Sequence, residues 1–245
     1  CTDCDANIFQ RVWLCVTANV DDTQVTLQDS DGNTIGSPIL LEAGESHRFD
    51  NINVGDRVVT SKPSMAYLIT GDQGEGYESR WYMLVPTDSW TTEYLSPVGT
   101  TQSNDPVHFF LYNDTDAPID VDVTTQVGTS TISVPAQDIY RYALTTNSGA
   151  SFVSTVPFSL VGVIDADYRD GDGGNDSRNS RVHDWGFTPI PTSALKGQYI
   201  VGWAPGAENQ PGGPDSSEND SPVWLTALEA THVCVDRDRD GTIDQ

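Results

Sequence analysis

Short runs of alternating or continuously apolar residues recur along the chain, and Gly, Asn, Asp and Pro separate them. Residues 24–27, 57–60 and 119–123 are clear examples. Such runs are typical of β-strands that bury at least one face. No window of about a dozen residues shows helical periodicity. Short strands with turn signals between them predict an all-β fold of sandwiches or Greek-key barrels.

The pattern of runs repeats. Trp13 lies in an apolar triplet that returns around Trp224, and residues 107–109 occupy the same place in the middle of the chain. A shift of about 94 residues relates the first strands of the two copies, and a shift of 105 aligns Tyr94 with Tyr199. The second copy therefore carries an insertion. A repeated order of strand-like segments indicates tandem modules.

We therefore predict two tandem β-sandwich repeats followed by a C-terminal hairpin from a partial third repeat. The predicted domains are residues 1–104 with a cysteine-containing N-terminus, residues 105–220 with an acidic inserted loop, and residues 221–245, the hairpin. A lone strand pair is at best marginally stable. The hairpin is expected to belong to a longer array, or to complete a sheet of this molecule or of a neighbour, since an exposed strand edge accepts a further strand.

The net charge of the chain limits the kinds of molecule that it can bind. The 36 acidic residues outnumber the 12 basic ones and give a net charge of -24. We expect no nucleic-acid partner, because binding one requires Lys and Arg to neutralise phosphates. No stretch approaches the roughly 20 apolar residues of a membrane span, so no membrane insertion is expected. The composition fits a protein of high-salt surroundings, or a cation-binding extracellular protein in ordinary medium.

Cysteines and sequons indicate the compartment. The four cysteines are Cys1, Cys4, Cys15 and Cys234. Disulfides are expected, because no second Cys or His pair follows at zinc-ligand spacing, and three connectivities remain open. Sequons for N-glycosylation begin at Asn113, Asn175 and Asn219. Because the chain starts at Cys1 and shows no signal peptide, we expect a processed product that is secreted or on the cell surface.

Two acidic stretches are candidates for Ca²⁺. The C-terminal one, with Asp236, Asp238, Asp240 and Asp244, alternates oxygen ligands and includes a glycine for the sharp turn, as in the first part of a calcium loop. The inserted loop supplies Asp165, Asp167, Asp170 and Asp172. Their mutual repulsion is relieved either by a bound cation or by high salt, and a solvated acidic loop is the other interpretation. Residues 29–33 fit an ordinary hairpin turn better than a calcium site.

Catalytic motifs are missing from the sequence. It contains no Gly-x-Ser-x-Gly, no phosphate loop and no His-Glu-x-x-His. His108 falls in a predicted strand, where a packed structural role is expected, and His183 has no nucleophile motif near it. We expect no enzyme.

The six tryptophans offer an aromatic surface for glycans. Trp81 and Trp185 align at one repeat position, and recurrence of this kind is what core packing produces. Trp90 and Trp203 do not recur, which makes them the better candidates for exposed stacking surfaces.

Two stretches of the first copy resemble a known family. The resemblance rests on residues 59–63, Ala66, Tyr67, 84–86, Trp90 and Tyr94. These resemble the N-terminal domain family of IgG-Fc-binding proteins, whose bacterial relatives are large secreted or surface proteins. The resemblance covers about half of each repeat. It implies an extracellular β-rich adhesion-type module with no catalytic residues, and it does not imply that this chain binds immunoglobulin.

Together these features predict an extracellular structural or assembly protein, such as a filament or surface-layer subunit joined by strand exchange, disulfides or both. Its partners would be further copies of itself in a homopolymer, or other surface proteins. The alternative is a calcium-stabilised adhesion or glycan-binding module of a larger cell-surface protein.

Overall fold

The computed structural model of the chain describes residues 11–71, 79–96, 107–144, 148–164, 185–196, 230, 232–234 and 243. Antiparallel β-sheets dominate these residues, so the predicted all-β fold is confirmed. Most of the predicted hairpin, residues 221–245, lies outside the described part. The number of repeats and the three domain boundaries stay predictions. No helix within the described residues is both long and apolar enough to span a membrane.

The described residues before position 97 form eight strands and one 3-10 turn. They are β1 (Arg11–Ala18), β2 (Thr23–Gln28), β3 (Thr34–Leu41), β4 (Ser46–Asp50), β5 (Arg57–Thr60), β6 (Ser64–Gly71), β7 (Ser79–Met83), η1 (Thr87–Ser89) and β8 (Thr91–Ser96). The elements that follow are β9 (Val107–Tyr112), β10 (Ile119–Thr125), β11 (Gly128–Val134), β12 (Ile139–Leu144), β13 (Ala150–Ile164), β14 (Trp185–Phe187) and η3 (Thr192–Ala194).

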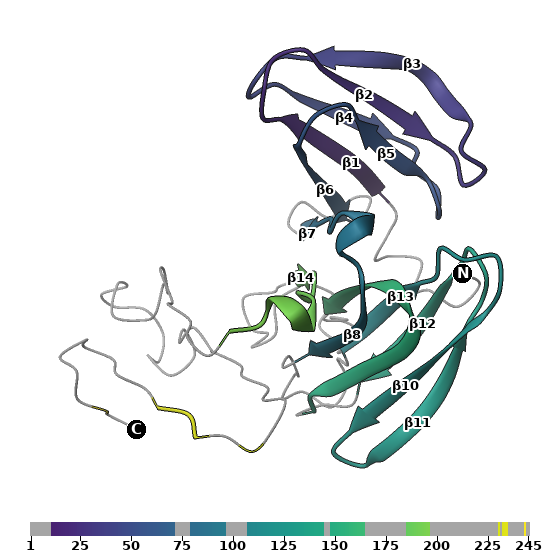
Figure 1. Ribbon diagram of the computed structural model, residues 1–245, viewed down its shortest axis with the longest axis vertical. Coiled ribbons are helices and arrows are strands. Elements are labelled where there is room, and N and C mark those ends of the chain that lie inside the picture. The colour runs from purple at the N-terminus through teal and green to yellow at the C-terminus, as the bar shows by residue number, and fades with distance from the viewer. Residues whose placement is uncertain are drawn as a thin grey trace, which may run out of the picture.

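The first seven strands form the first sandwich. One sheet has the order β4-β1-β6-β7 and the other the order β3-β2-β5 (Figure 1). In β1, Val16 and Ala18 alternate with less buried residues, and they meet Val25 and Leu41 of the other sheet in a small core. The period of two along each strand is what buries one face of each sheet against the other.

Strands β9 to β14 form the second sandwich in the same order. Its sheets run β12-β9-β13-β14 and β11-β10-β13, which correspond to β4-β1-β6-β7 and β3-β2-β5. The long β13 takes the place of both β5 and β6. Its first part, through Ser154, pairs with β10, and its second part, from Ser159, pairs with β9. One strand therefore passes from one sheet to the other, with an irregularity between Val153 and Phe158.

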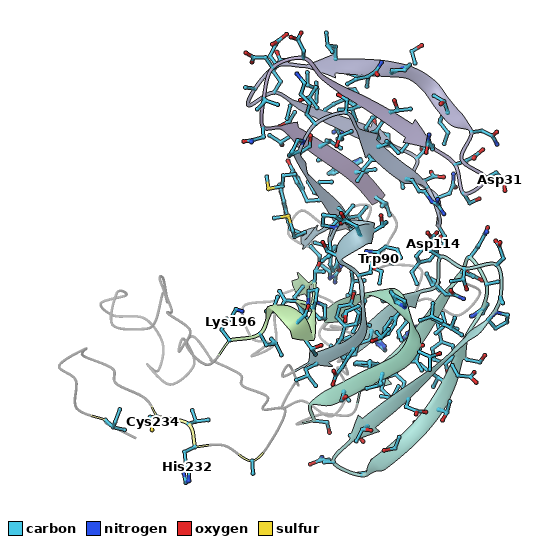
Figure 2. The ribbon with its side chains drawn as sticks, in the orientation of Figure 1. Asp31, Trp90, Asp114, Lys196, His232 and Cys234 are labelled. Carbon is cyan, nitrogen blue, oxygen red and sulfur yellow. The ribbon has the colours of Figure 1, made fainter. Side chains whose placement is uncertain are left out.

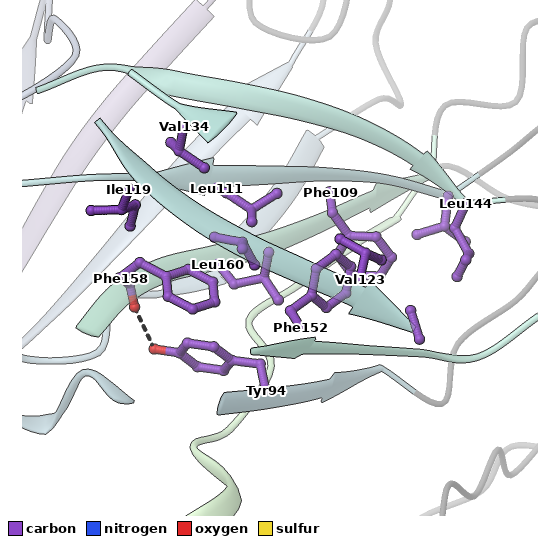
Figure 3. Close-up of a cluster of buried hydrophobic side chains, with 13 residues drawn as sticks. Tyr94, Phe109, Leu111, Ile119, Val123, Val134, Leu144, Phe152, Phe158 and Leu160 are labelled. Carbon is purple, nitrogen blue, oxygen red and sulfur yellow. Dashed lines mark hydrogen bonds between the residues drawn. The ribbon is translucent and has the colours of Figure 1, made fainter. Parts of the chain in front are cut away.

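The second sandwich is completed by β8, which precedes it in the chain. β8 pairs with the first part of β13 and sets Tyr94 opposite Phe152. Tyr94 is 1% exposed and belongs to the main core of the second sandwich. Its hydroxyl donates a hydrogen bond of 2.8 Å to the carbonyl oxygen of Phe158, and the two rings meet edge to face (Figure 3). Although β8 lies within the predicted first domain, it is a strand of the second sandwich.

Strand β7 makes a second contact between the sandwiches. Tyr82 packs against Phe110 and Val163 on the outer face of the sheet β12-β9-β13-β14. Gly186 lies directly beneath the Tyr82 ring, and a Cβ at this position would collide with it. The hydroxyl of Thr188 donates to the carbonyl oxygen of Met83 at 2.7 Å. Glycine at position 186 is therefore what allows β7 to lie on the second sandwich.

Polar and aromatic contacts complete the junction (Figure 2). Trp90 meets Tyr112 edge to face with ring centroids 6.1 Å apart. Arg57 forms an ion pair with Asp114, with 2.6 Å between Nη2 and Oδ1. We call β7, η1 and β8 together, residues 79–96, the joint segment. It connects the sandwiches and also contributes side chains to the packing of the second one.

Replacing Tyr94 by Ala is expected to lower the free energy of unfolding of the second sandwich by about 3–5 kcal/mol, because it removes a fully buried aromatic ring. Tyr94→Phe keeps the ring and loses the hydrogen bond to Phe158 and the long one, 3.5 Å, accepted from the backbone nitrogen of Thr91, so a loss of about 1 kcal/mol is expected. Urea denaturation of both variants measures the difference. Equal losses in the two variants would contradict the insertion of the ring into this core.

Candidate functional site

Aromatic and thioether side chains gather on the outer face of the sheet β4-β1-β6-β7. Cross-strand pairing sets Trp13 opposite Ile69, Ile69 opposite Trp81, and Tyr67 opposite Met83. The rings of Tyr67 and Trp81 are stacked with centroids 5.3 Å apart. We call this surface the aromatic face; its members are Trp13, Met65, Tyr67, Trp81 and Met83.

Much of the aromatic face is open to solvent. Trp81 is 58% exposed, Met83 53% and Met65 45%. Apolar surface in water is unfavourable by roughly 25 cal/mol per Å², and contiguous exposed apolar patches mark interaction sites. The aromatic face is therefore the strongest candidate binding surface among the described residues.

The structure corrects the sequence interpretation of Trp81. A core position was expected from its alignment with Trp185, but Trp81 is mostly exposed. Strand pairing also shows that the two are not equivalent. Trp185 pairs with Ile164, as Arg80 pairs with Thr70 in the first sandwich. The residue that takes the place of Trp81 in the second sandwich is the next one along, Gly186.

Trp90 was expected on an exposed stacking surface and instead lies half-buried at the junction. Its indole nitrogen donates a hydrogen bond of 3.0 Å to the carbonyl oxygen of Val85. Its ring lies against Tyr112. Trp90 therefore stabilises the joint segment and presents no stacking platform. The other candidate, Trp203, lies outside the described residues.

A basic side chain borders the aromatic face. The guanidinium of Arg48 lies 5.0 Å from the centre of the Trp13 ring and pairs with Asp50 at 3.1 Å. The second sandwich has the same arrangement, in which Nε of Arg141 donates to Nδ1 of His108 at 3.1 Å. His108 is 8% exposed, as expected for a structural histidine.

In the second sandwich the face equivalent to the aromatic face is covered. Phe110 and Val163 stand where the first sandwich has Cys15 and Ile69, and Tyr82 of the joint segment packs on them. Gly186, in the place of Trp81, leaves room for the Tyr82 ring. The first sandwich thus exposes the face through which the second sandwich binds its neighbour.

The free edge of β5 is a second unmatched surface. Within the described residues β5 pairs with β2 alone, whereas the equivalent part of β13 has β10 on one side and β8 on the other. Val58 of β5 is half-buried, and its counterpart Phe152 is fully buried. We call the side of β5 that faces away from β2 the open edge.

No disulfide is seen at the two described cysteines: Cys15 and Cys234 are free thiols, the first buried and the second exposed. A disulfide between copies at the exposed Cys234 stays a prediction. Burial raises the pKa of the Cys15 thiol, while a hydrogen bond with Tyr67 and the charge of Arg48 act in the opposite direction. Cys15 is therefore a protonated packing residue beneath the aromatic face. Cys1 and Cys4 lie outside the described residues.

The glycosylation prediction does not hold at Asn113 in the folded chain. Asn113 is fully buried, and its Nδ2 donates hydrogen bonds to the carbonyl oxygens of Ala117, Val134 and Pro135. Its Oδ1 accepts from the backbone nitrogen and the hydroxyl of Thr115. A glycan on Nδ2 would take one of its two hydrogens from these bonds and would need space that a fully buried side chain does not have. Asn175 and Asn219 lie outside the described residues.

No group of three or more His, Cys, Asp or Glu in the described part of the chain could hold a metal ion. The carboxylate of Asp29 accepts hydrogen bonds from the backbone nitrogen and Nδ2 of Asn33, at 2.8 and 3.0 Å, which lowers the pKa of Asp29. This geometry fits the hairpin-turn interpretation of residues 29–33. The calcium candidates Asp165, Asp167, Asp170, Asp172, Asp236, Asp238, Asp240 and Asp244 all lie outside the described residues, and calcium binding there stays a prediction.

Thiol labelling tests the state of Cys15. In the native protein at pH 8 we expect a maleimide to modify Cys15 at least about tenfold more slowly than Cys234, because burial keeps the Cys15 thiol protonated and covered. Peptide-level mass spectrometry with and without urea measures both rates. A disulfide-linked peptide containing residue 15 would contradict the structure.

Asn113→Ala is expected to lower the free energy of unfolding by about 2–3 kcal/mol, because it leaves buried carbonyl groups without their donor. The matched control is Asn53→Ala at an exposed asparagine, where a change within about 0.5 kcal/mol is expected. Urea denaturation compares the two variants. A glycan found on Asn113 of the folded protein would overturn the assignment.

Comparison with known proteins gives one match. A family model described as IgGFc binding protein matches residues 6–163. The matched range includes every strand from β1 to β12 and nearly all of β13, and therefore the joint segment and both uncovered surfaces. No curated protein and no solved structure matches the chain.

Proposed function

The chain belongs to the IgGFc-binding protein family, and from this premise we propose that it is an extracellular structural protein that assembles with further copies of itself. Membership of the family indicates an extracellular surface module that binds other surface proteins. The proposed role is mechanical joining of modules into a filament or surface layer, with no catalytic activity.

The observation that carries the proposal is the insertion of β8 into the second sandwich. A strand that follows one sandwich completes the sheet of the next and buries Tyr94 in its core. Strand addition joins modules through a continuous set of backbone hydrogen bonds as well as apolar contacts. Because strand pairing joins two sandwiches of one chain, strand pairing of the same kind can also join sandwiches of different copies.

The aromatic face gives further support. It corresponds to the surface on which Tyr82 packs in the second sandwich, and it is uncovered on the first. Burying Trp81, Met65 and Met83 against another module would remove a large apolar area from water, which favours association.

The net charge of -24 opposes association of identical chains. Ions screen repulsion between exposed charges beyond about 8–10 Å at physiological salt, and beyond about 3 Å at 1 M salt. Assembly is therefore expected to strengthen with ionic strength. Bound Ca²⁺ at the acidic stretches would have the same effect, as proposed from their sequence.

A second candidate function uses the same surface. The stacked rings of Tyr67 and Trp81 form an exposed platform of the kind that binds apolar or sugar faces. The chain would then be an adhesion or glycan-binding module of a larger cell-surface protein.

Negative-stain electron microscopy of the natively isolated protein, over a range of NaCl and CaCl₂ concentrations, tests the proposal. We expect regular fibres or sheets that become more abundant with salt. The double variant Trp81→Ser with Met83→Ser should weaken assembly by at least about tenfold, because it removes the apolar face from an exposed site without disturbing a core. The matched control is Val127→Ser, at an apolar residue 86% exposed in the β10–β11 turn.

Discrete monomers at every salt and calcium concentration would contradict the structural role and favour the adhesion module. In that case, a glycan array probed with the native protein and with the Trp81 and Met83 variant decides whether the aromatic face binds sugar.

A further inference from the structure

We propose that the open edge of β5 takes up residues 196–201 of a second copy of this chain as an added antiparallel strand. The inference rests on the proposed function and names its partner and contact surface. It follows from the way β8 binds β13, from the matching geometry of η1 and η3, and from the incomplete burial of the first sandwich.

The second sandwich contains an edge equivalent to the open edge of β5, and that edge is paired with β8. Val58 of β5 pairs with Leu27, and Phe152 of β13 pairs with Val123 in the equivalent sheet. On its other side Phe152 lies opposite Tyr94 of β8. A strand added to β5 in the same register would place a tyrosine opposite Val58.

The donor segment follows a turn with the geometry of η1. Pro86 before η1 has φ -53 and ψ 143, and Pro191 before η3 has φ -53 and ψ 139. The residues that end the turns, Trp90 and Leu195, have φ -64 and ψ 150, and φ -65 and ψ 146. The chain therefore leaves η3 with the backbone direction that leads from η1 into β8.

The sequence after η3 repeats that of β8. Residues 196–201 read Lys-Gly-Gln-Tyr-Ile-Val, against Thr-Thr-Glu-Tyr-Leu-Ser in β8. Tyr199 thus holds the place of Tyr94, and Ile200 that of Leu95. The segment is polar through Gln198 and apolar from Tyr199 to Val201, and in a strand the side chains of Gln198 and Ile200 would lie on the side opposite to Tyr199.

The first sandwich has a smaller residue where the incoming ring would pack. In the second sandwich Tyr94 packs on the ring of Phe158 and donates to its carbonyl oxygen. Strand pairing puts the smaller Ser64 at the corresponding position of β6. A Tyr199 ring there would cover Val58, which is only half-buried without it.

Donor and acceptor lie on different parts of the molecule. Figure 2 shows Lys196, the first donor residue, beside the second sandwich, whereas the acceptor β5 is a strand of the first sandwich. Copies joined in this way would repeat head to tail, which gives an open chain of molecules. The donor copy would also bring its second sandwich to the aromatic face, as β7 of the joint segment lies on the second sandwich within one chain.

Cross-linking between two variants, each with one introduced cysteine besides the buried Cys15, tests the register. The pair Val153–Glu93 predicts that Val59 lies directly opposite Gln198. One copy carries Val59→Cys and the other Gln198→Cys, both with serine at Cys1, Cys4 and Cys234, and they are mixed under mild oxidation. We expect at least tenfold more disulfide-linked dimer than from Val127→Cys mixed with Gln198→Cys. Equal yields from the two mixtures overturn the inference.

Tyr199→Ser in the full chain provides the second measurement. We expect association to weaken by at least about tenfold, since a buried aromatic anchor is lost, with Val127→Ser as the matched control. Hydrogen exchange should show the β5 amides that point away from β2 protected in assemblies and exchanging rapidly in dilute monomer, whereas the β5 amides that bond to β2 are protected in both. Protection of the outward-pointing amides in the dilute monomer would mean that residues of the same chain, such as 1–10, cover the edge, and would overturn the inference.

The outcomes separate this inference from the proposed function. Fibres that form equally well with Tyr199→Ser, and without the predicted cross-link, leave the structural role standing and overturn strand addition at β5. A specific Val59–Gln198 cross-link in discrete dimers, with no fibre at any salt concentration, supports strand addition and contradicts the filament role.

Discussion

Pairing of β8 with the first part of β13 is the interaction on which the two-sandwich structure depends. It adds a further strand to the sheet of β10 and β11, and it inserts Tyr94 between Phe152 and Phe158. The same strand is covalently continuous with η1 and β7, so Tyr82 can pack on Phe110 and Val163 from the other side. Backbone pairing and apolar burial therefore act together at one junction. A shift of one sandwich relative to the other would break the β8–β13 pairing as well as the apolar contacts of Tyr82.

The first sandwich shows what a module of this fold looks like without such a neighbour. Its buried apolar residues are mostly aliphatic and small, among them Val16, Ala18, Val25 and Leu41, whereas the core of the second includes the rings of Tyr94, Phe109, Phe152 and Phe158. The residues that a neighbour would cover, Val58 on the open edge and Trp81 on the aromatic face, are the ones left partly in water. Burial is thus unequal between two sandwiches of the same strand order, because a completing strand reaches only one of them in the described residues.

Several site residues could not be read from sequence because their role depends on which face of a strand they occupy. Trp81 and Trp185 align in sequence, yet strand pairing shows that Gly186 takes the place of Trp81, and a shift of one position in a strand exchanges the two faces. Asn113 satisfies a sequon, and only the folded chain shows its amide holding three carbonyl groups in the core. The spacing of Met65, Tyr67 and Ile69 indicates that these side chains share one side of β6. Alternation alone does not say which side faces the solvent.

The sequence by itself determined the class of fold, and it predicts the alignment of Tyr94 with Tyr199, because these follow from local alternation, turn residues and internal repetition. It also determined the charge that any assembly must overcome. Only the tertiary structure decided where β8 binds, that Cys15 is a buried thiol, and that no described residue covers the aromatic face or pairs with the open edge of β5. Pairing between strands distant in sequence is chosen by the burial it achieves across the whole module, and that gain exists only once the sheets have come together.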